Sequence, residues 1–224
     1  MRYFAAMFLA VVTLAASAEP QHVSFPTQDD GVVHADIYGK GDRAVLLAHG
    51  GRLTKESWTR QAETLAAAGF RVMAIDFRGR GQSHGGAGDS PNNSGFHFDV
   101  LAGVHYLHET GAGTVSVIGA SFGGWAAARA AVEAGPGEID RLVLLAATAA
   151  EPERLPGRKL FILARDDVRG EGVPRLPAIR AQYEQAPEPK ELVILDGSAH
   201  AQFIFETEQG EQLMSEILRF LSAP

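Results

Sequence analysis

The sequence contains no cysteine, and this absence removes several kinds of chemistry at once. A chain without thiols forms no disulfide, carries no thiolate nucleophile and holds no metal through sulfur. It also accepts no lipid through a sulfur atom. Cysteine usage therefore says nothing about the compartment in which the protein works.

Clusters of positive charge are absent as well. The chain has 20 Lys and Arg against 27 Asp and Glu, a formal net charge of -7, and no basic block or stripe. Nucleic-acid affinity rests on neutralising a run of phosphates, which needs such a stripe. We therefore expect no nucleic-acid partner.

The first residues, MRYFAAMFLAVVTLAASAEP, differ in composition from the rest of the chain. Arg2 precedes an uncharged apolar stretch at residues 3–16, and Ala16-Ser17-Ala18 forms a small-x-small cleavage signature. The stretch is short for a bilayer span, which takes about 20 residues, and Glu19-Pro20 would end a helix. This pattern favours a secretory signal peptide at residues 1–18 over a membrane anchor or an N-terminal helix. We expect a periplasmic or secreted protein with no stable membrane span after cleavage.

From residue 21 onward, short β-branched runs alternate with longer helical segments. The first two runs alternate like a hairpin, whereas the later runs are almost continuously apolar and suit parallel strands buried on both faces. The runs lie at residues 22–25, 32–38, 44–49, 70–75, 114–119, 141–147, 159–164 and 191–196, and the helical segments at 56–68, 94–109, 122–134, 177–185 and 206–221. This alternation predicts an α/β fold with a doubly wound, mostly parallel sheet. No repeat or interdomain linker interrupts it, so we expect a single domain at residues 19–224.

A serine lies at one of the strand-to-helix junctions. The segment Gly119-Ala120-Ser121-Phe122-Gly123 follows a buried run directly and precedes a helical one. This G-x-S-x-G pattern is typical of a nucleophile elbow, a tight turn that holds the serine in a strained conformation with its hydroxyl exposed. A dinucleotide fingerprint would need glycine in place of the serine, and a P-loop would need Gly-Lys-Ser/Thr. Ser121 is therefore the candidate nucleophile.

A serine that attacks a carbonyl also needs donors for the oxyanion that forms. His49-Gly50-Gly51 ends the strand predicted at residues 44–49, and its glycines let the backbone turn an N–H toward the elbow. The N–H groups of Gly51 and of Phe122, which begins the helix after the serine, are the candidate oxyanion hole. We interpret His49 as a residue that braces this loop, not as a base.

The serine needs a base as well, and the base needs a group that orients it. Asp166 and Asp167 follow one predicted strand in FILARDDV, and His200 follows the last strand in ILDGSAHAQF. Because the carboxyl ends of parallel strands share one edge of a sheet, these side chains should meet Ser121 there. Serine, acid and histidine come in the chain order used by one hydrolase fold. Both carboxylates remain candidates for the acid.

In these motifs the chain resembles the α/β-hydrolase superfamily over nearly everything after residue 18. The motifs are HGG (49–51), DFRGRGQS (76–83), GASFGG (119–124), ARDD (164–167) and GSAH (197–200). The resemblance implies an α/β-hydrolase fold and a catalytic triad of Ser121, an aspartate and His200, with no cofactor and no metal. It also implies a structural role for Asp76, Arg78 and Ser83.

Two departures from the family pattern matter for the site. The family's acid stands three residues after a glycine that closes the strand, and Ala164 replaces that glycine here. The spacing favours Asp167 as the acid and leaves Asp166 as the alternative. Many members insert a helical lid after the strand that follows the elbow helix, but residues 148–158 are too few for one. We therefore expect no cap domain and an open site, similar to small serine esterases and dienelactone-hydrolase-like proteins.

The resemblance further implies acyl transfer to water through an acyl-enzyme on Ser121. The expected substrates are small-molecule carboxylic esters with small or medium acyl groups. Thioesters, lipids, and amides or peptides are alternatives on the same residues, and a non-catalytic homologue that only binds a ligand or partner is another. Trp58, Trp125, Phe203 and Phe205 are candidates for the wall of an acyl pocket, although core packing is the stronger interpretation for most of them.

The N-terminal pattern makes a prediction about export. Protein recovered from the envelope or medium of a bacterial host should begin at Glu19, because the small residues before it suit the cleaving peptidase. N-terminal sequencing or intact-mass measurement of the exported protein checks this. An intact Met1 on the exported protein would contradict the prediction and indicate an anchor.

Overall fold

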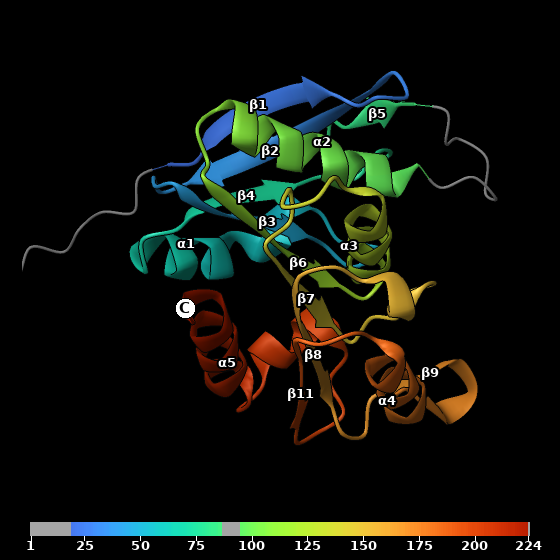
Figure 1. The fold of residues 1–224 in the computed structure, drawn as a ribbon. Helices are drawn as coiled ribbons and strands as arrows, with labels where there is room; N and C mark the ends of the chain where they lie inside the picture. The colour runs from blue at the N-terminus through green and yellow to red at the C-terminus, as the bar shows by residue number, and fades with distance from the viewer. Residues whose placement is uncertain (1–18, 87–94, 224) are drawn as a thin grey trace, which may run out of the picture.

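The computed structural model describes residues 19–86 and 95–223, so the predicted signal peptide at residues 1–18 lies outside the described residues. The chain folds around a nine-stranded sheet with helices on both faces (Figure 1). Across the sheet the strands come in the order β1 (Gln21–Pro26), β2 (Gly31–Tyr38), β4 (Arg71–Ile75), β3 (Arg43–Ala48), β6 (Thr114–Ala120), β7 (Arg141–Leu145), β8 (Arg158–Ala164) and β11 (Lys190–Leu195), with β5 (His84–Gly85) paired to β2.

The strands pair in parallel from β4 to β11, while β1 with β2 and β2 with β4 pair antiparallel. In the centre of the sheet, Ala48 of β3 lies opposite Gly119 of β6. The carboxyl ends of β3 and β6 therefore meet at one edge. The predicted doubly wound, mostly parallel sheet is confirmed.

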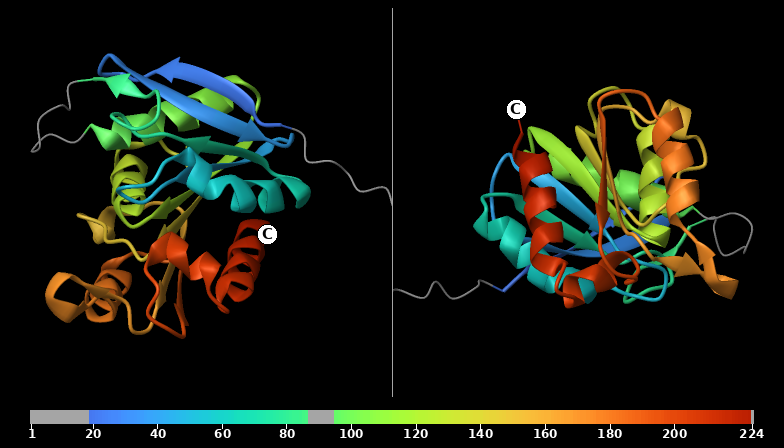
Figure 2. Two further views of the ribbon diagram at one scale, coloured as in Figure 1. Left: turned by 180° about the vertical axis from the view of Figure 1, so that it is seen from behind. Right: turned by 90° about the horizontal axis from the view of Figure 1, so that it is seen from below.

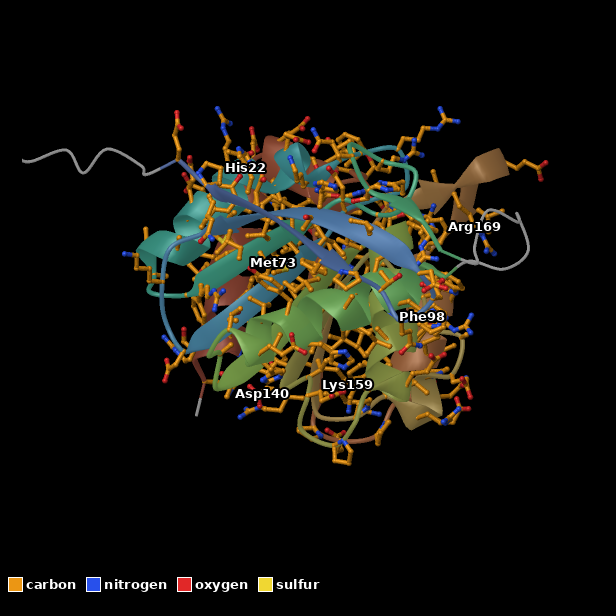
Figure 3. The ribbon with its side chains drawn as sticks, turned by 90° about the horizontal axis from the view of Figure 1, so that it is seen from above. His22, Met73, Phe98, Asp140, Lys159 and Arg169 are labelled. Atoms are coloured by element: carbon orange, nitrogen blue, oxygen red, sulfur yellow. The ribbon has the colours of Figure 1, made fainter. Side chains whose placement is uncertain are left out.

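The helices cover the sheet in two layers. Helices α1 (Thr59–Ala67) and α5 (Gly210–Ser222) lie on one face, and α2 (Phe96–Glu109), α3 (Phe122–Glu133) and α4 (Leu176–Gln185) lie on the other (Figures 1 and 2). Both faces of the central strands are buried as a result, which explains their continuous apolar sequence. Seen from above, Met73 of β4 lies inside the molecule, and His22 of β1 lies toward its rim (Figure 3).

The structure differs from the sequence prediction at several helix starts and in a small hairpin. The helix predicted at residues 56–68 begins with a 3-10 helix, Lys55–Trp58, before α1. The helix predicted at residues 206–221 begins only at Gly210, after the 3-10 helix Ala201–Glu206. Strands β9 (Val168–Arg169) and β10 (Val173–Pro174) form a separate antiparallel hairpin, which the hydrophobic pattern of the sequence did not predict.

No cap domain lies between β7 and β8. The connection, residues 146–157, is described in full and contains only the 3-10 helix Pro152–Arg154. The edge of the sheet where the site motifs end is therefore left uncovered by this connection. In the described ranges, no helix combines the length and the apolar character needed to cross a bilayer.

The DFRGRGQS loop is held by polar contacts of its own. The buried Arg78 guanidinium pairs with Asp29 at 2.6 Å and with Asp99 at 2.7 Å. Burying a charge is costly unless it is paired, and two carboxylates meet that need here. The hydroxyl of Ser83 accepts the N–H of His34 at 2.8 Å. These contacts tie the loop to β2 and α2, which is a structural role.

Candidate active site

Ser121 occupies the turn between β6 and α3. Its φ of 52° and ψ of -114° lie outside the usual regions for a residue with a side chain. The N–H of Ser121 donates to the carbonyl of Leu145 at 2.8 Å, and its own carbonyl accepts the N–H of Trp125 at 3.1 Å. The strained conformation is thus fixed from both sides, by a neighbouring strand and by the first turn of the helix.

Glycines on either side of the serine allow the strand and the helix to approach closely. A Cβ on Gly119 would lie 2.5 Å from the Cα of Gly124, closer than carbon atoms pack. A Cβ on Gly123 would collide with the carbonyl oxygens of Ala48 and His49. Only glycine fits either place, so the turn brings the start of α3 against the end of β3.

The structure brings Ser121, His200 and Asp167 together at the carboxyl edge of the sheet. His200 follows β11, and its Nε2 lies 2.8 Å from Ser121 Oγ. Its Nδ1 lies 2.7 Å from Asp167 Oδ2, in the loop after β8. The Asp167 side chain is 1% exposed and that of His200 is 28% exposed. A hydroxyl, an imidazole and a buried carboxylate in a hydrogen-bonded row can move a proton off the serine.

The adjacent carboxylates have different surroundings. Asp166 is exposed, and its backbone N–H donates to the carbonyl of Gly197 at 2.9 Å. Asp167 turns inward, with its N–H 3.3 Å from the carbonyl of Ala164 in a tight turn that ends β8. Of these two residues, Asp167 is therefore the one that contacts His200.

Arg175 is a contact of Asp167 that the sequence analysis missed. The β9–β10 hairpin leads the chain back, and the N–H of Arg175 donates to the Asp167 carbonyl at 2.9 Å. The guanidinium Nε lies 3.4 Å from Asp167 Oδ1, an ion-pair distance rather than a hydrogen bond. A buried carboxylate thus has an imidazole on one oxygen and a guanidinium near the other. The contact depends on the hairpin, so the spacing of residues in the sequence carried no signal for it.

His49 braces the loop that follows β3. It is 1% exposed, and burial lowers the pKa of its imidazole. The N–H of Phe77 donates to His49 Nε2 at 3.3 Å, so in the neutral ring Nδ1 carries the proton and donates to the Gly50 carbonyl at 2.8 Å. Both ring nitrogens are occupied by backbone groups, which leaves His49 no capacity to act as a base.

Gly51 and Phe122, the residues of the candidate oxyanion hole, lie next to each other. A Cβ on Gly51 would be 3.6 Å from the Cβ of Phe122, so the two residues are neighbours. Phe122 is the first residue of α3, where an N–H has no partner within the helix. Neither N–H has a hydrogen-bond partner among residues 19–86 and 95–223. Neighbouring residues that both carry a free N–H, one of them at the positive end of a helix dipole, suit an oxyanion.

A cavity of about 300 Å³ is lined by Gly51 and Phe122, and Arg78 and Arg80 also line it. Its aromatic wall comes from Phe77, Phe96 and Phe122, whose rings pack edge to face with centroids 4.7–5.7 Å apart. Phe77 and Phe96 were not among the aromatic residues considered from the sequence. Trp58, which was, is 1% exposed and packs in the core.

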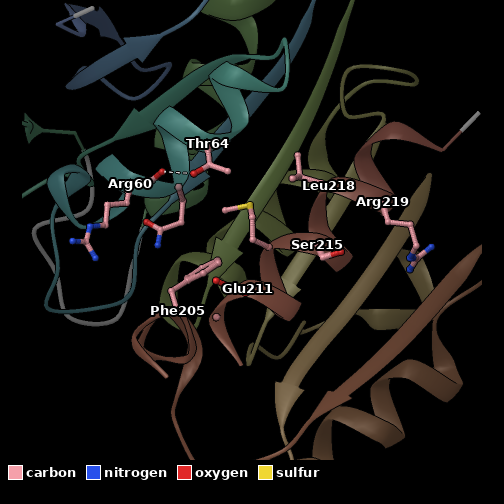
Figure 4. A pocket seen from close by; sticks show the side chains of 10 residues that line it. Arg60, Thr64, Phe205, Glu211, Ser215, Leu218 and Arg219 are labelled. Atoms are coloured by element: carbon pink, nitrogen blue, oxygen red, sulfur yellow. Dashed lines mark hydrogen bonds between the residues drawn. The ribbon is translucent and has the colours of Figure 1, made fainter. Parts of the chain in front are cut away.

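A larger cavity of about 750 Å³ lies between α1 and α5 (Figure 4). Phe205, Met214 and Leu218 line it together with polar residues such as Arg60 and Thr64. Like the smaller cavity, it is lined by none of Ser121, Asp167 and His200, but unlike the smaller cavity it is also not lined by Gly51 or Phe122. In the part of the chain that the structure describes, no cluster of three or more His, Asp or Glu side chains could hold a metal ion.

The family model described as serine aminopeptidase, S33, matches residues 39–178, more than half of the chain. The chain belongs to this family. The S33 match includes Gly51, Ser121, Phe122 and Asp167 and ends before His200. The predicted α/β-hydrolase superfamily is confirmed.

Curated relatives of this S33 chain include a non-heme haloperoxidase from Rhodococcus erythropolis. It is 33% identical over 140 residues, which cover 59% of this chain and 49% of the relative. A 2-hydroxy-6-oxononadienedioate/2-hydroxy-6-oxononatrienedioate hydrolase from Cupriavidus pinatubonensis is 32% identical over 127 residues, covering 54% of this chain and 41% of that protein. The matched region thus spans about half the length of these relatives or less.

Solved structures resemble the S33 chain over most of its length. The Pyrococcus furiosus esterase Pf2001 superposes with a TM-score of 0.76 at 21% identity, covering 91% of this chain and 92% of that one. A bromoperoxidase from Bacillus anthracis has a TM-score of 0.73 at 17% identity, covering 91% of this chain and 100% of the other. At these identities the likeness shows the fold.

The geometry predicts unequal effects for the paired carboxylates. Asp167→Asn should lower turnover of a chromogenic ester by a factor on the order of 10⁴, because an amide sets the wrong imidazole tautomer. Steady-state kinetics measure the loss. Asp166→Asn, which changes an exposed neighbour, is the matched control and should alter turnover by less than about tenfold. A severe loss in the control with a mild loss in Asp167→Asn would transfer the acid's role to Asp166.

Proposed function

We propose that the protein is a serine hydrolase that cleaves carboxylic esters of small or medium acyl groups. One observation carries this proposal: the row of Asp167, His200 and Ser121, with contacts of 2.7 and 2.8 Å, ends beside two backbone N–H groups that have no partner in the described residues. Nucleophile, base, orienting acid and oxyanion donors are the parts that acyl transfer needs.

The acylation step follows from the positions of these atoms. His200 Nε2 takes the proton of the Ser121 hydroxyl as Oγ attacks the carbonyl carbon of the ester. Asp167 holds the imidazole in the required tautomer and stabilises the imidazolium that forms. The negative charge moves onto the carbonyl oxygen, which the N–H groups of Gly51 and Phe122 receive. Each such donor contributes about 2.7 to 4 kcal/mol to transition-state stability in enzymes where one was removed.

The second half of the reaction uses the same residues in reverse order. His200 donates its proton to the leaving alcohol, and the acyl group stays on Ser121 as an ester. A water molecule then gives a proton to His200 and attacks the acyl carbon, so a second oxyanion forms against the same donors. Release of the acid returns the proton to Ser121 Oγ. No cofactor or metal enters these steps.

The surroundings of the donors support small acyl groups. Gly51 and Phe122 both line the cavity of about 300 Å³, and we place one substituent of the carbonyl carbon there. Its aromatic wall suits an apolar group of limited length. The β7–β8 connection supplies no lid, so the alcohol portion is left toward solvent.

An amide is the second candidate substrate, and the family match supports it. The matching model is described as a serine aminopeptidase, whose reaction uses the same proton transfers with an amine as the leaving group. Amino-acid anilides therefore belong in the same assays as the esters. Faster turnover of an anilide than of any short-chain ester would replace the ester assignment with an amidase or peptidase.

Ser121→Ala tests the nucleophile. The change should abolish nearly all ester hydrolysis, because it removes the attacking oxygen. It should keep the free energy of unfolding within about 1 kcal/mol of the wild type, since the hydroxyl contributes little to packing. A covalent serine probe, read by intact mass, should label the wild type and not the variant. Ser215→Ala, in the larger cavity, is the control and should behave like the wild type. Undiminished turnover by Ser121→Ala would rule out the mechanism.

A panel of chromogenic esters with increasing acyl length tests the substrate class. Turnover divided by KM should fall as the acyl chain outgrows the cavity beside Gly51 and Phe122. The rate should rise smoothly with substrate concentration, because no lid has to open at a lipid surface. A sharp increase in rate at the solubility limit of the substrate would instead indicate a lipase.

A further inference from the structure

Gln202 is a buried amide that the proposed reaction does not use. It lies two residues after His200, is 6% exposed, and belongs to the 3-10 helix Ala201–Glu206. The residue between them, Ala201, has a φ of 51° and is 3% exposed. Because of this left-handed turn, the side chains of His200 and Gln202 both reach the candidate active site from one short segment. A buried primary amide is expected to have specific partners, since burying it without hydrogen bonds is costly.

Both ends of the Gln202 amide are hydrogen-bonded. Its Oε1 accepts the backbone N–H of Gly50 at 2.7 Å, and its Nε2 donates to Ser57 Oγ at 2.9 Å. A backbone N–H can only donate, so the amide oxygen faces Gly50 and the nitrogen faces Ser57. Ser57 Oγ in turn donates to the carbonyl of Thr54 at 2.6 Å. The amide nitrogen is therefore anchored by Ser57, and the amide oxygen holds the loop after β3 at Gly50.

The carbonyls of Gly50 and Gly51 in the same loop are also occupied. The Gly50 carbonyl accepts from His49 Nδ1 at 2.8 Å, and the Gly51 carbonyl accepts from Arg80 at 2.8 Å. With the N–H of Gly50 held by Gln202, the N–H of Gly51 is the donor left free beside Phe122. The hydrogen bond from Gln202 thus fixes the peptide that precedes this free donor.

We infer that Gln202 is a positioning residue for the oxyanion hole. Through the Gly50 N–H it locks the loop that presents Gly51 and ties that loop to the segment carrying His200. The base and one oxyanion donor are then held at a fixed distance from each other by a single side chain. This inference rests on the proposed ester hydrolysis and adds a residue to it.

The physical reason is preorganisation. An oxyanion hole accelerates a reaction only if its donors already point at the place where charge develops, and a displacement of about 1 Å can cost a factor of 10². Without the bond to Gln202, the N–H of Gly50 loses its partner, and the loop is held through the carbonyls of Gly50 and Gly51. The loss should appear in the transition state and not in substrate binding, because the carbonyl carries little charge in the ground state.

Gln202→Met tests the inference, since methionine is similar in length and shape but cannot make either bond. We expect kcat for a short-chain ester to fall by about ten- to a hundredfold with KM changed by less than about twofold. Binding of an alkylboronic acid, which forms a tetrahedral adduct on Ser121, should weaken by the same factor as kcat/KM. Gln182→Met is the matched control, because Gln182 Oε1 accepts the N–H of Ala149 at 2.7 Å outside this loop.

A kcat at least fivefold below that of Gln182→Met, with KM unchanged, supports the inference. A smaller loss, or a loss carried by KM, overturns it. If Gln202→Met does not fold, Ser57→Ala decides, because Ser57 is exposed and its loss frees the far end of the amide. A kcat lower by about twofold or more at constant KM then supports the role, and a smaller change overturns it. Failure of the proposed serine mechanism itself would show separately, as undiminished ester hydrolysis by Ser121→Ala.

Discussion

The close contact between the end of β6 and the start of α3 is the constraint on which the site depends. Because Gly119 and Gly123 carry no side chain, the helix begins directly against the carboxyl ends of β3 and β6. At that contact Ser121 has a positive φ, and its Oγ lies 2.8 Å from His200 Nε2. The contact also places the free N–H of Phe122 beside Gly51. One steric requirement therefore positions both the candidate nucleophile and the candidate oxyanion hole.

Burial of charge is managed differently in the two polar clusters of the molecule. Arg78 is surrounded by Asp29 and Asp99 and serves to hold a loop to the sheet. Asp167 is also buried, but its partners are a partly exposed imidazole and a guanidinium at 3.4 Å. A buried carboxylate with one partner that can exchange protons is suited to chemistry, whereas a fully paired one is suited to structure. The difference lies in the partners and not in the degree of burial.

The loop after β3 shows how segments far apart in the sequence cooperate at one edge of the sheet. Gly50 and Gly51 are held by Gln202 from the end of the chain and by Arg80 from the loop after β4. Each bond is local in space and distant in sequence, so the loop acquires its shape only when the sheet is complete. Phe77 and Phe96 line the adjacent cavity, and their side chains take no part in these bonds.

Local patterns in the sequence were enough to predict the α/β architecture, the parallel strands and the place of Ser121 at a strand-to-helix turn, because buried strands and tight turns select residue types over short stretches. The spacing favoured Asp167 as the acid but kept Asp166 as the alternative, since the two differ only in the direction that the turn after β8 gives them. The contacts of Arg175 and Gln202, and the cavity wall at Phe77 and Phe96, were not foreseen. They arise between segments whose separation is set by the packed sheet, and a side chain's hydrogen-bond partner across such a distance leaves no periodic or local mark in the sequence.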